Sequence, residues 1–418
     1  MKLYKIVIAS CLILSGYNAS AQQPADNVKM DNYIKGLMAK MTLDEKIGQL
    51  NLPSIGFDVT GPILSQGVEE KIEKGMVGGV FNTYTPVAVR KLQELAIKKT
   101  RLKIPLLFGY DVIHGHRTIF PIPLGMAATW DMPLIKKAAR AAASESAADG
   151  LNWVFSPMVD IARDPRWGRV SEGAGEDTWL GSQIAKAIVM GYQGTDLRKN
   201  DAVLACVKHF ALYGAAEAGR DYNVVDMSIR KMTETYLPPY KAAVDAGVAT
   251  VMSSFNEING VPAAANHWLL TDLLRKQWGF KGMVATDYTA IMELVNHGVG
   301  DTAEVTKLAL VAGNDMDMVS DFYITKLKKL VQDKKLDVAV IDLACRRVLE
   351  SKYRLGLFTD PYRNISEARA AKEIMSPDKI QLAREAAQKS IVLLKNDNNT
   401  LPLQAGQKIA FVGPMIKN

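Results

Sequence analysis

Short apolar runs alternate along most of the chain with longer segments that repeat apolar residues at helical spacing. The short runs predict eight β-strands, and helical patterns separate most of them. These strands are expected at Gln49–Leu52, Gly78–Phe81, Ile104–Asp111, Trp153–Asp160, Ala202–His209, Thr250–Phe255, Gly282–Asp287 and Asn314–Met318. Helices are expected at Pro133–Asp149, Arg230–Ala246 and Trp268–Trp278, each followed by a glycine that suits a helix C-terminus.

Near-continuous apolar strands that alternate with helices are typical of a parallel α/β sheet. Eight such units within about 300 residues predict a TIM (β/α)8 barrel. An open doubly wound sheet is the alternative, but no Gly-x-Gly-x-x-Gly motif follows the first expected strand. The predicted fold is therefore α/β, with a (β/α)8 barrel over residues 22–360.

Several of the expected strands end in residues that can carry chemistry. Asp287 closes the run that begins at Gly282, and the other strand ends carry Asp111, Lys208 with His209, Met252 and Asp317. The carboxyl ends of the strands of a barrel form its active-site face. These side chains are therefore expected to form one site.

Each of these residues also has a structural interpretation. Asp287 could cap the following helix. Lys208 and His209 are adjacent, so in a regular strand one would point inward and the other outward; both reach the interior only if the backbone departs from that geometry. His114 and His116 have a spacing that invites a zinc site, but no acidic or cysteine ligands complete it. Asp315 and Asp317 alternate along a strand and suggest only a weak cation site.

The loop over residues 163–177 is rich in arginine, acidic residues and glycine. An arginine there, such as Arg169, could donate hydrogen bonds to sugar hydroxyls or to carboxylates. A structural loop held by salt bridges is the alternative.

The N-terminus has the pattern of a secretory signal peptide over residues 1–21. Lys2 and Lys5 precede the apolar run Ile6–Leu14, and Ala19-Ser20-Ala21 matches a cleavage site. A periplasmic or secreted protein without a membrane anchor is expected. Cys206 and Cys345, the cysteines beyond this segment, read as core residues that could form at most one disulfide.

Composition narrows the class of protein. Of the 418 residues, 48% are hydrophobic and 23% are charged, as in a globular protein. The net charge of +7 is spread along the chain without a basic cluster between aromatic residues, so no nucleic-acid partner is expected.

The C-terminal part predicts the start of a second domain. A helix is expected at Asp337–Leu355 and another up to Ser390, followed by strands at Ile391–Leu394 and Ile409–Val412. A lone strand cannot bury its own faces. Residues 361–418 are therefore expected to form a linker and the first strand of a truncated α/β sandwich domain.

Several motifs together resemble glycoside hydrolase family 3, in its periplasmic β-glucosidase branch, over essentially the whole mature chain. They begin at Met41, Phe108, Arg166, Lys208, Gly219, Met252 and Thr286, and include Phe108-Gly-Tyr-Asp111, Arg166-Trp-Gly-Arg169, Lys208-His209-Phe210, Gly219-Arg-Asp-Tyr222 and Thr286-Asp287-Tyr288.

The resemblance implies a retaining β-glucosidase that hydrolyses terminal non-reducing β-D-glucosyl residues, without a cofactor or metal. It implies that Asp287 is the nucleophile and that Asp111, Arg169, Lys208, His209, Met252 and Tyr288 contact the sugar. Tyr288 stands where the branch usually has Trp or His, which leaves the preferred glycone open, with xylose as one alternative.

The acid/base glutamate of this branch lies in the second domain, which would be expected in cis. Retaining glycosidases use two carboxyl groups, so activity of this chain alone is expected to be impaired. Glu176, Glu257 and Glu293 are available but match no acid/base position. The alternatives are a non-catalytic glycan-binding barrel or an inactive fragment. A β-N-acetylhexosaminidase is less favoured, because no histidine follows His209 in the loop up to Ala215.

Overall fold

The centre of the molecule is a curled sheet of six parallel strands. The computed structural model describes residues 24–55, 65–414 and 416. The strand order is β2-β3-β4-β5-β6-β9, and every neighbouring pair is parallel. The strands are β2 (Gly79–Phe81), β3 (Leu107–Tyr110), β4 (Trp153–Val154), β5 (Leu204–Phe210), β6 (Thr250–Ser253) and β9 (Met283–Thr286).

A second parallel pair lies beside this sheet. It joins β1 (Asn51–Leu52) to β10 (Asp317–Met318). Isolated bridges connect Ser54 to Phe81 of β2, and Ala285 of β9 to Met316. All eight predicted apolar runs therefore contain a strand, although each strand is shorter than its run or displaced within it.

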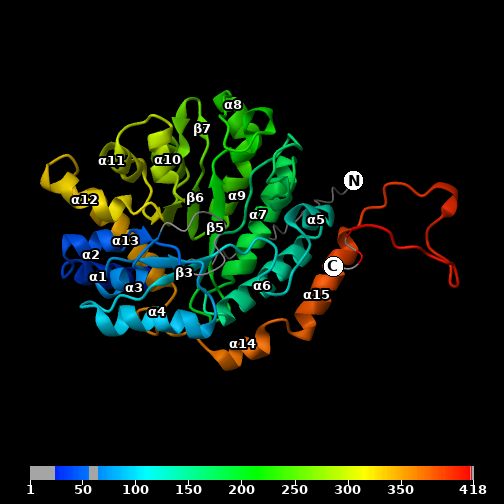
Figure 1. Ribbon diagram of the computed structural model, residues 1–418, viewed down its shortest axis with the longest axis horizontal. Helices are drawn as coiled ribbons and strands as arrows, with labels where there is room; N and C mark the ends of the chain where they lie inside the picture. Colours follow the sequence, from blue (N-terminus) through cyan, green and yellow to red (C-terminus); the bar gives the residue numbers. More distant parts are fainter. Residues whose placement is uncertain (1–23, 56–64, 415, 417–418) are drawn as a thin grey trace, which may run out of the picture.

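Helices surround the strands (Figure 1). Near the start and middle of the chain they are α1 (Pro24–Met38), α2 (Leu43–Gly48), α3 (Val68–Glu73), α4 (Pro86–Lys99), α5 (Pro123–Ala128), α6 (Met132–Ala148), α7 (Thr178–Gln193), α8 (Ile229–Lys231) and α9 (Pro238–Asp245). Later helices are α10 (Ala290–Asn296), α11 (Thr302–Ala312), α12 (Phe322–Gln332), α13 (Val338–Arg354), α14 (Glu367–Glu373) and α15 (Pro377–Ser390).

The two faces of the sheet belong to different parts of the core. In β5, Leu204 and Cys206 pack with Leu107, Trp153, Met283 and Ala285 of other strands. Ala205 and Val207, which alternate with them, and Val203, which precedes the strand, pack with side chains of α6, α7 and α9. This alternation of side chains is the one expected of a strand covered on both faces.

Two of the three predicted helices differ from a regular α-helix. Pro133–Asp149 is confirmed as α6. Arg230–Ala246 is divided into α8, the π-helical turn η4 (Met232–Tyr236) and α9, because Pro238 cannot donate the backbone bond that would continue a helix. Trp268–Trp278 forms the π-type helix η6 (Trp268–Gln277). The three glycines after these segments all adopt positive φ, as a helix end requires.

A small hairpin was not predicted. Strands β7 (Glu257–Ile258) and β8 (Val261–Pro262) pair antiparallel around Asn259 and Gly260, which have φ values of 50° and 80°. Asn-Gly is the strongest local signal for such a turn, so the sequence contained the information.

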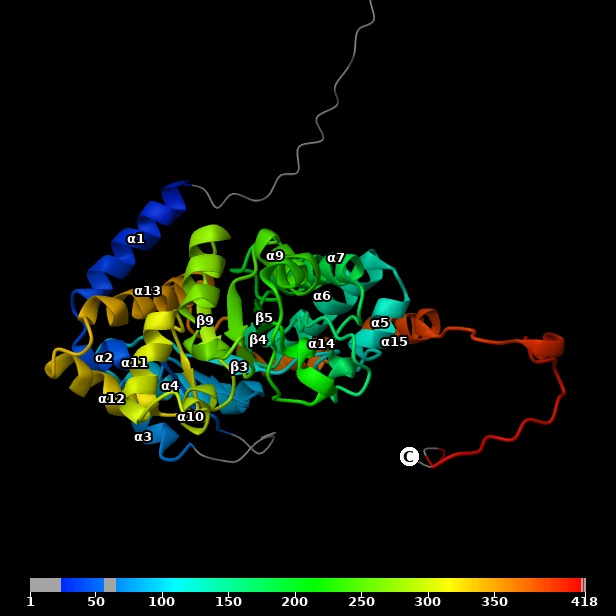
Figure 2. The same ribbon diagram turned by 90° about the horizontal axis from the view of Figure 1, so that it is seen from above.

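The predicted strands at Ile391–Leu394 and Ile409–Val412 are wrong. Both segments lack regular structure and are largely exposed, with Leu394 at 91% and Val412 at 88%. Beyond α15 the chain leaves the body and forms an extended loop in both views (Figures 1 and 2). The apolar pattern of a strand does not produce one where no neighbouring strand is available for pairing.

α14 packs against α6, and α15 packs against α5 and α6. Among the residues that the structure describes, no helix has the length and apolar character to cross a bilayer. Cys206 and Cys345 are buried and unpaired, so they form no disulfide with each other. The predicted signal peptide lies outside the described residues.

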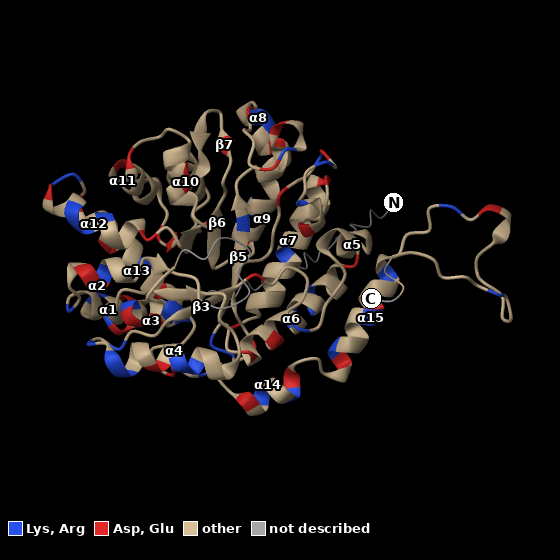
Figure 3. Ribbon diagram, viewed as in Figure 1, with Lys and Arg blue, Asp and Glu red and all other residues tan. Residues whose placement is uncertain are grey.

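Charged residues of both signs are interspersed over the outer helices (Figure 3).

Candidate active site

The candidate site is built where the parallel strands end. Asp287 follows Ala285 by two positions, and Lys208 follows Cys206 by two, so each continues the series of side chains on the Leu204 face of the sheet. Asp111 likewise follows Gly109 by two positions. A Cβ on Gly109 would lie 2.6 Å from Cζ of Phe155. The pleat of the strands thus delivers two carboxylates and one ammonium to one end of the sheet.

His209 departs from this alternation. The peptide bond between Lys208 and His209 is cis, and the pairing of β5 with β6 shifts register between Val207 and Phe210. Both side chains are buried, at 3% and 1% exposure for the two residues, and both contact site residues. The register shift is the departure from regular strand geometry under which both side chains can point inward.

Lys208 and Asp111 form an ion pair at the mouth of the site. Lys208 Nζ lies 2.6 Å from Asp111 Oδ1; the lysine side chain is 4% exposed, whereas the aspartate side chain is 39% exposed. A lysine buried to this extent requires a charged or polar partner. Asp111 supplies that partner while one side of its carboxylate faces solvent.

Arg169 comes from the charged loop and is held by Glu172 and His209. Its Nε and Nη2 donate to the two oxygens of Glu172, at 2.8 and 3.0 Å, and Nη2 also donates to His209 Nε2 at 3.0 Å. Burial lowers the pKa of Arg169, but Glu172 and Asp287 outweigh burial and raise it above its usual value. The loop is therefore held by a salt bridge and brings Arg169 to His209, while the predicted contact of Arg169 with sugar stays a prediction.

His209 is neutral and anchored on both ring nitrogens. Nδ1 lies 2.9 Å from Asp160 Oδ2, and the backbone N–H of His209 donates to the same oxygen at 2.9 Å. Burial, followed by the charges of Arg169 and Lys208, holds the pKa of His209 well below its ordinary value. The ring therefore acts as a hydrogen-bonding group rather than as a cation.

Asp287 lies among these groups and does not cap a helix with its side chain. Its Oδ1 accepts the backbone N–H of Tyr288 at 2.7 Å, and its Oδ2 lies 3.5 Å from His209 Nε2. Within the described part of the chain, Oδ2 has no hydrogen-bond partner. The side chain as a whole is 13% exposed, but Oδ2 itself is buried, so Asp287 has one carboxylate oxygen that is shielded from solvent and not engaged by another group.

The electrostatics of Asp287 differ from the simplest expectation. Burial raises the pKa of its carboxyl to about 7, although Arg169, Lys208 and the Tyr288 N–H each oppose the change. The two cations favour the charged form, as expected. Desolvation is nevertheless the larger effect, and the carboxyl titrates near neutrality.

Of the remaining predicted sugar contacts, Tyr288 adjoins the nucleophile candidate and Met252 lies deeper. The Tyr288 ring meets Phe81 edge-on, with 6.2 Å between centroids. Met252 is 2% exposed and packs in the core with Cys206 and Ala285. Met252 therefore lies below the site, and its predicted contact with sugar stays a prediction.

Aromatic residues after β5 and β6 make one wall near Arg169. The guanidinium lies 5.5 Å from the centroid of Tyr213, and the rings of Tyr213, Tyr222 and Phe255 contact one another. Tyr222 is 53% exposed. Such a surface suits the apolar face of a sugar ring.

The residues considered for cation binding have other partners. Asp315 is buried between Arg275, at 2.6 Å, and Arg347, at 2.9 Å. Asp317 Oδ2 accepts the N–H groups of Phe322 and Tyr323 at the start of α12. The suggested cation site at Asp315 and Asp317 is not supported: both oxygens of Asp315 are paired with arginines, and Oδ1 of Asp317 is the one oxygen of the two carboxylates that has no partner within the described residues.

The two histidines of the H-x-H spacing also have separate partners. His114 Nδ1 contacts the carbonyl oxygen of Phe120 at 3.0 Å, and His116 Nε2 contacts Asp149 at 2.7 Å. Across residues 24–55, 65–414 and 416, no group of three or more potential ligands is arranged to hold a metal ion.

The three spare glutamates have surroundings of their own. Glu257 pairs with His297 at 2.7 Å, and Glu176 is exposed. Glu293 accepts from Thr289 Oγ1 at 3.2 Å, and burial raises its pKa.

Asp160, Glu172 and Tyr240 were not predicted as site residues. Asp160 and Tyr240 Oη contact each other next to His209. Asp160 ends an expected strand in the same way as Asp287, so the pattern that identified Asp287 could have found it. Glu172 stands three residues after Arg169, a spacing that allows a local ion pair. Tyr240 lies on a helix far away in sequence and carries no such signal.

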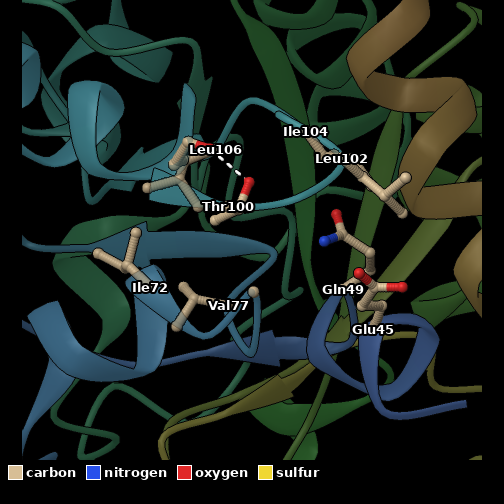
Figure 4. Close-up of a pocket in the computed structure, with 10 residues that line it drawn as sticks. Glu45, Gln49, Ile72, Val77, Thr100, Leu102, Ile104 and Leu106 are labelled. Carbon is tan, nitrogen blue, oxygen red and sulfur yellow. Dashed lines mark hydrogen bonds between the residues drawn. The ribbon is translucent and has the colours of Figure 1, made fainter. Parts of the chain in front are cut away.

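A separate small cavity lies among residues that precede the strands, and Figure 4 shows the side chains that line it. It has about 20 Å³ of space, roughly one water, and its lining includes Gln49, Val77 and Leu106, which precede β1, β2 and β3. None of the predicted site residues lines it. Residues at that end of such a fold generally contribute to stability rather than to catalysis.

Comparison with known proteins identifies the family of this chain. The N-terminal domain of glycosyl hydrolase family 3 matches residues 42–351. The chain belongs to this family. The family match covers β1 to β10, and with them every predicted site residue.

Relatives within the family include glucosidases and xylosidases. A periplasmic beta-glucosidase of Salmonella typhimurium is 44% identical over 95% of this chain and 52% of its own length. A beta-xylosidase of Formosa agariphila is 34% identical over 83% of this chain and 51% of its own length. The chain thus spans about half the length of the curated relatives it matches.

Solved structures confirm the family fold. The beta-glucosidase of Listeria innocua in complex with isofagomine matches with a TM-score of 0.85 and 41% identity, over 89% of this chain and 52% of that one. A mutant of the same enzyme in complex with laminaribiose matches with a TM-score of 0.84 and 40% identity, over 89% of this chain and 53% of that one. The chain thus shares the fold of the part of these β-glucosidases that it covers, which is about half of their length.

Proposed function

We propose that this chain carries the nucleophile and the sugar-binding half of a retaining β-glucosidase active site. Its substrates are the terminal non-reducing β-D-glucosyl residues of β-glucosides and oligosaccharides. The observation that carries the proposal is the oxygen Oδ2 of Asp287, which has no hydrogen-bond partner within the described residues and lies beside Arg169, Lys208 and His209. In this mechanism Asp287 attacks the anomeric carbon and forms a covalent glycosyl-enzyme.

The surrounding groups fit the recognition of a sugar. Asp111 can accept hydrogen bonds from two hydroxyls, while Lys208 and Arg169 only donate. His209 and Tyr288 border the same space, and Met252 supports it from below. The relatives of known structure contain isofagomine or laminaribiose. We extend that specificity to this chain as a β-glucoside, with a xyloside as the competing substrate.

Asp111 and Glu172, two carboxylates near Asp287, are poorly suited to act as the general acid/base. A general acid needs a pKa raised toward the working pH. Asp111 is paired with Lys208. Burial raises the pKa of Glu172, but Arg169 outweighs burial and lowers it below the usual value. We propose that the acid/base lies in a further α/β sandwich domain in cis, since the full-length relatives are about twice as long.

We place this site in a closed (β/α)8 barrel over residues 22–360. The bridges from Ser54 to Phe81 and from Ala285 to Met316 support closure, because they connect the β1–β10 pair to both edges of the six-stranded sheet. We also propose export to the periplasm or beyond after cleavage behind Ala21. The name of the Salmonella relative agrees with that location.

A non-catalytic glycan-binding barrel is the second candidate. Its support is that Asp111 and Glu172, two carboxylates near Asp287, are held in ion pairs, which leaves sugar binding intact without proton donation. Turnover of an activated substrate distinguishes the two candidates.

The test compares the chain with its Asp287→Asn variant. The chain should hydrolyse an aryl β-glucoside with a good leaving group, and the variant should lose at least about 10³-fold in rate, because its amide cannot form the glycosyl-enzyme. Asp333→Asn, at an exposed ion pair with Lys329, is the matched control and should keep full activity. Equal rates for the chain and Asp287→Asn would refute the proposal.

A further inference from the structure

Behind His209 lies a carboxylate that is almost fully shielded from solvent and stands apart from the sugar-binding face of the ring. Asp160 is 1% exposed. Its Oδ2 faces both the backbone N–H and the Nδ1 of His209, each at 2.9 Å, and its Oδ1 contacts Tyr240 Oη. Tyr240 Oη also contacts the carbonyl oxygen of His209 at 2.6 Å. Asp160 and Tyr240 thus hold the ring and both backbone polar groups of His209.

The partners of the ring determine where its single proton lies. A guanidinium has donors only, so His209 Nε2, at 3.0 Å from Arg169 Nη2, must accept. The proton is then on Nδ1, where Asp160 Oδ2 accepts it. The depressed pKa of His209 agrees with a ring that carries one proton rather than two.

This tautomer has a consequence for the nucleophile candidate. Nε2 lies 3.5 Å from Asp287 Oδ2 as well as beside Arg169. A proton on Nε2 would be held in the ring plane against the donors of Arg169, and the acceptor within reach of it would be Asp287 Oδ2, which it would engage. A bare Nε2 fixes Arg169 and leaves Asp287 Oδ2 available.

We infer that Asp160 is a positioning residue that keeps the His209 proton on Nδ1, so that Nε2 accepts from Arg169 and Asp287 Oδ2 stays unbonded. The inference about the tautomer stands on the geometry alone; its role in sugar chemistry rests on the proposed function. Asp160 touches no reacting atom in this scheme and acts only through His209.

Nuclear magnetic resonance of ring nitrogens can test the tautomer directly, since the chain has only five histidines. Long-range proton–nitrogen spectra of ¹⁵N-histidine-labelled protein should show His209 with a protonated Nδ1 and a bare Nε2. A proton on Nε2 in the unaltered chain would overturn the inference, whatever the variants do.

The decisive variant is Asp160→Leu, which fills a similar volume without an acceptor. Its His209 should shift toward the Nε2-protonated form, because Nδ1–H would be left without a buried partner. Tyr240→Phe removes a hydroxyl from the same cluster but keeps Asp160 Oδ2, so the Nδ1 proton should remain. An unchanged tautomer in Asp160→Leu, or a switch in Tyr240→Phe, would contradict the assignment to Asp160.

Asp149→Asn is the matched control for the spectra. Asp149 forms a buried pair with His116 at 2.7 Å, of the same chemistry as Asp160 with His209. The variant should change the His116 signals and leave those of His209 unaltered. A change at His209 would show that its ring responds to distant alterations, and the inference would fail.

Isofagomine titration adds the link to sugar chemistry. Asp160→Leu should weaken binding by about 10- to 100-fold, the range expected for loss of one hydrogen bond to a charged group. A tautomer switch with unchanged affinity would overturn the positioning role. If the unaltered chain binds no isofagomine, the proposed sugar site fails, while the tautomer result is still read independently.

Discussion

At the scale of single residues, the site is governed by the competition between burial and opposite charge. Asp287 has two cations nearby and still titrates at about pH 7, because burial outweighs them. His209 is driven the other way by burial and by the same cations, so it stays neutral. The same desolvation therefore raises the pKa of the acid and lowers that of the base.

The raised pKa of Asp287 predicts the acid limb of the pH profile. A nucleophile must be ionised, so inactivation by an activated 2-deoxy-2-fluoroglucoside should slow about tenfold per pH unit below pH 7. Above pH 7 the rate should be constant until another group titrates. A profile that stays flat down to pH 5 would show that Asp287 is ionised far more easily than its burial implies.

The raised pKa of Asp287 also predicts that replacing its carboxylate by a neutral side chain increases the free energy of unfolding. The carboxyl of an unfolded chain has a pKa of about 4, while the folded value is about 7. The folded state therefore binds the proton of this carboxyl more tightly than the unfolded state does. This proton binding stabilises the folded state below about pH 4, and the contribution is lost as pH rises through 7.

Asp287→Asn avoids that loss, so its free energy of unfolding at pH 8 should exceed that of the unaltered chain by about 1–4 kcal/mol. Urea unfolding at pH 8 and pH 4 measures the effect, and the difference should disappear at pH 4. A destabilised variant at pH 8 would mean that Arg169 and Lys208 depend on the charge of Asp287 more than burial opposes it.

At the scale of elements, the strands place the site and the loops complete it. Alternation along β3, β5 and β9 brings Asp111, Lys208 and Asp287 to one end of the sheet. Their positions follow from the sequence, because period-two patterning and strand ends are local features. Arg169 and Asp160 depend on how loops fold back, and Tyr240 on helix packing. These positions are set by tertiary contacts, and the sequence pattern therefore did not reveal that Asp160 and Tyr240 join the site.

Substitution of Gly109 tests the close packing of β3, the strand that places Asp111 at the candidate site. Gly109→Ala would place a methyl group 2.6 Å from Phe155. Overpacking of this kind should lower the free energy of unfolding by about 1–3 kcal/mol. The same substitution at Gly36 in α1, where an added Cβ would meet no atom within 4 Å beyond the backbone of its own helix, should be neutral or slightly stabilising. Thermal unfolding compares the two, and equal melting temperatures would contradict this packing.

A buried network near β10 gives a second test at this scale. Asp315 is enclosed by Arg275 and Arg347, and removing one partner of a buried charge cluster costs about 3–5 kcal/mol. Asp315→Ala should therefore unfold at much lower urea than Asp333→Ala, whose ion pair with Lys329 is exposed. Similar midpoints would restore the possibility that Asp315 is free for another ligand.

At the scale of the whole molecule, this chain corresponds to the N-terminal half of longer family 3 glycosidases. The parallel α/β fold and the eight strand-bearing runs were predictable, because their apolar periodicity is strong. The irregular C-terminal segment was not, since Ile391–Leu394 and Ile409–Val412 have the composition of strands and the outcome depends on partners outside them. Apolar residues of this segment are exposed, with Phe411 at 81%.

The dependence of the hydrolysis rate on the leaving group tests the proposal that this chain carries the nucleophile but not the acid/base. Without an acid/base, glucosides with good leaving groups should react, while alkyl glucosides should react about 10²–10⁴-fold more slowly than they do with a full-length relative. Parallel assays with the Salmonella relative supply that reference. Comparable rates on alkyl glucosides would mean that the chain already contains its acid/base, with Glu293 as the first residue to substitute.

The most direct measurement of the central claim is covalent trapping of the nucleophile. An activated 2-deoxy-2-fluoro-β-glucoside needs no acid catalysis to form the glycosyl-enzyme and then hydrolyses slowly. Peptide mass spectrometry of the treated chain should find one fluoroglucosyl group, on Asp287, and none on the Asp287→Asn variant. Labelling of another carboxylate, or no labelling of a chain that binds isofagomine, would contradict the account.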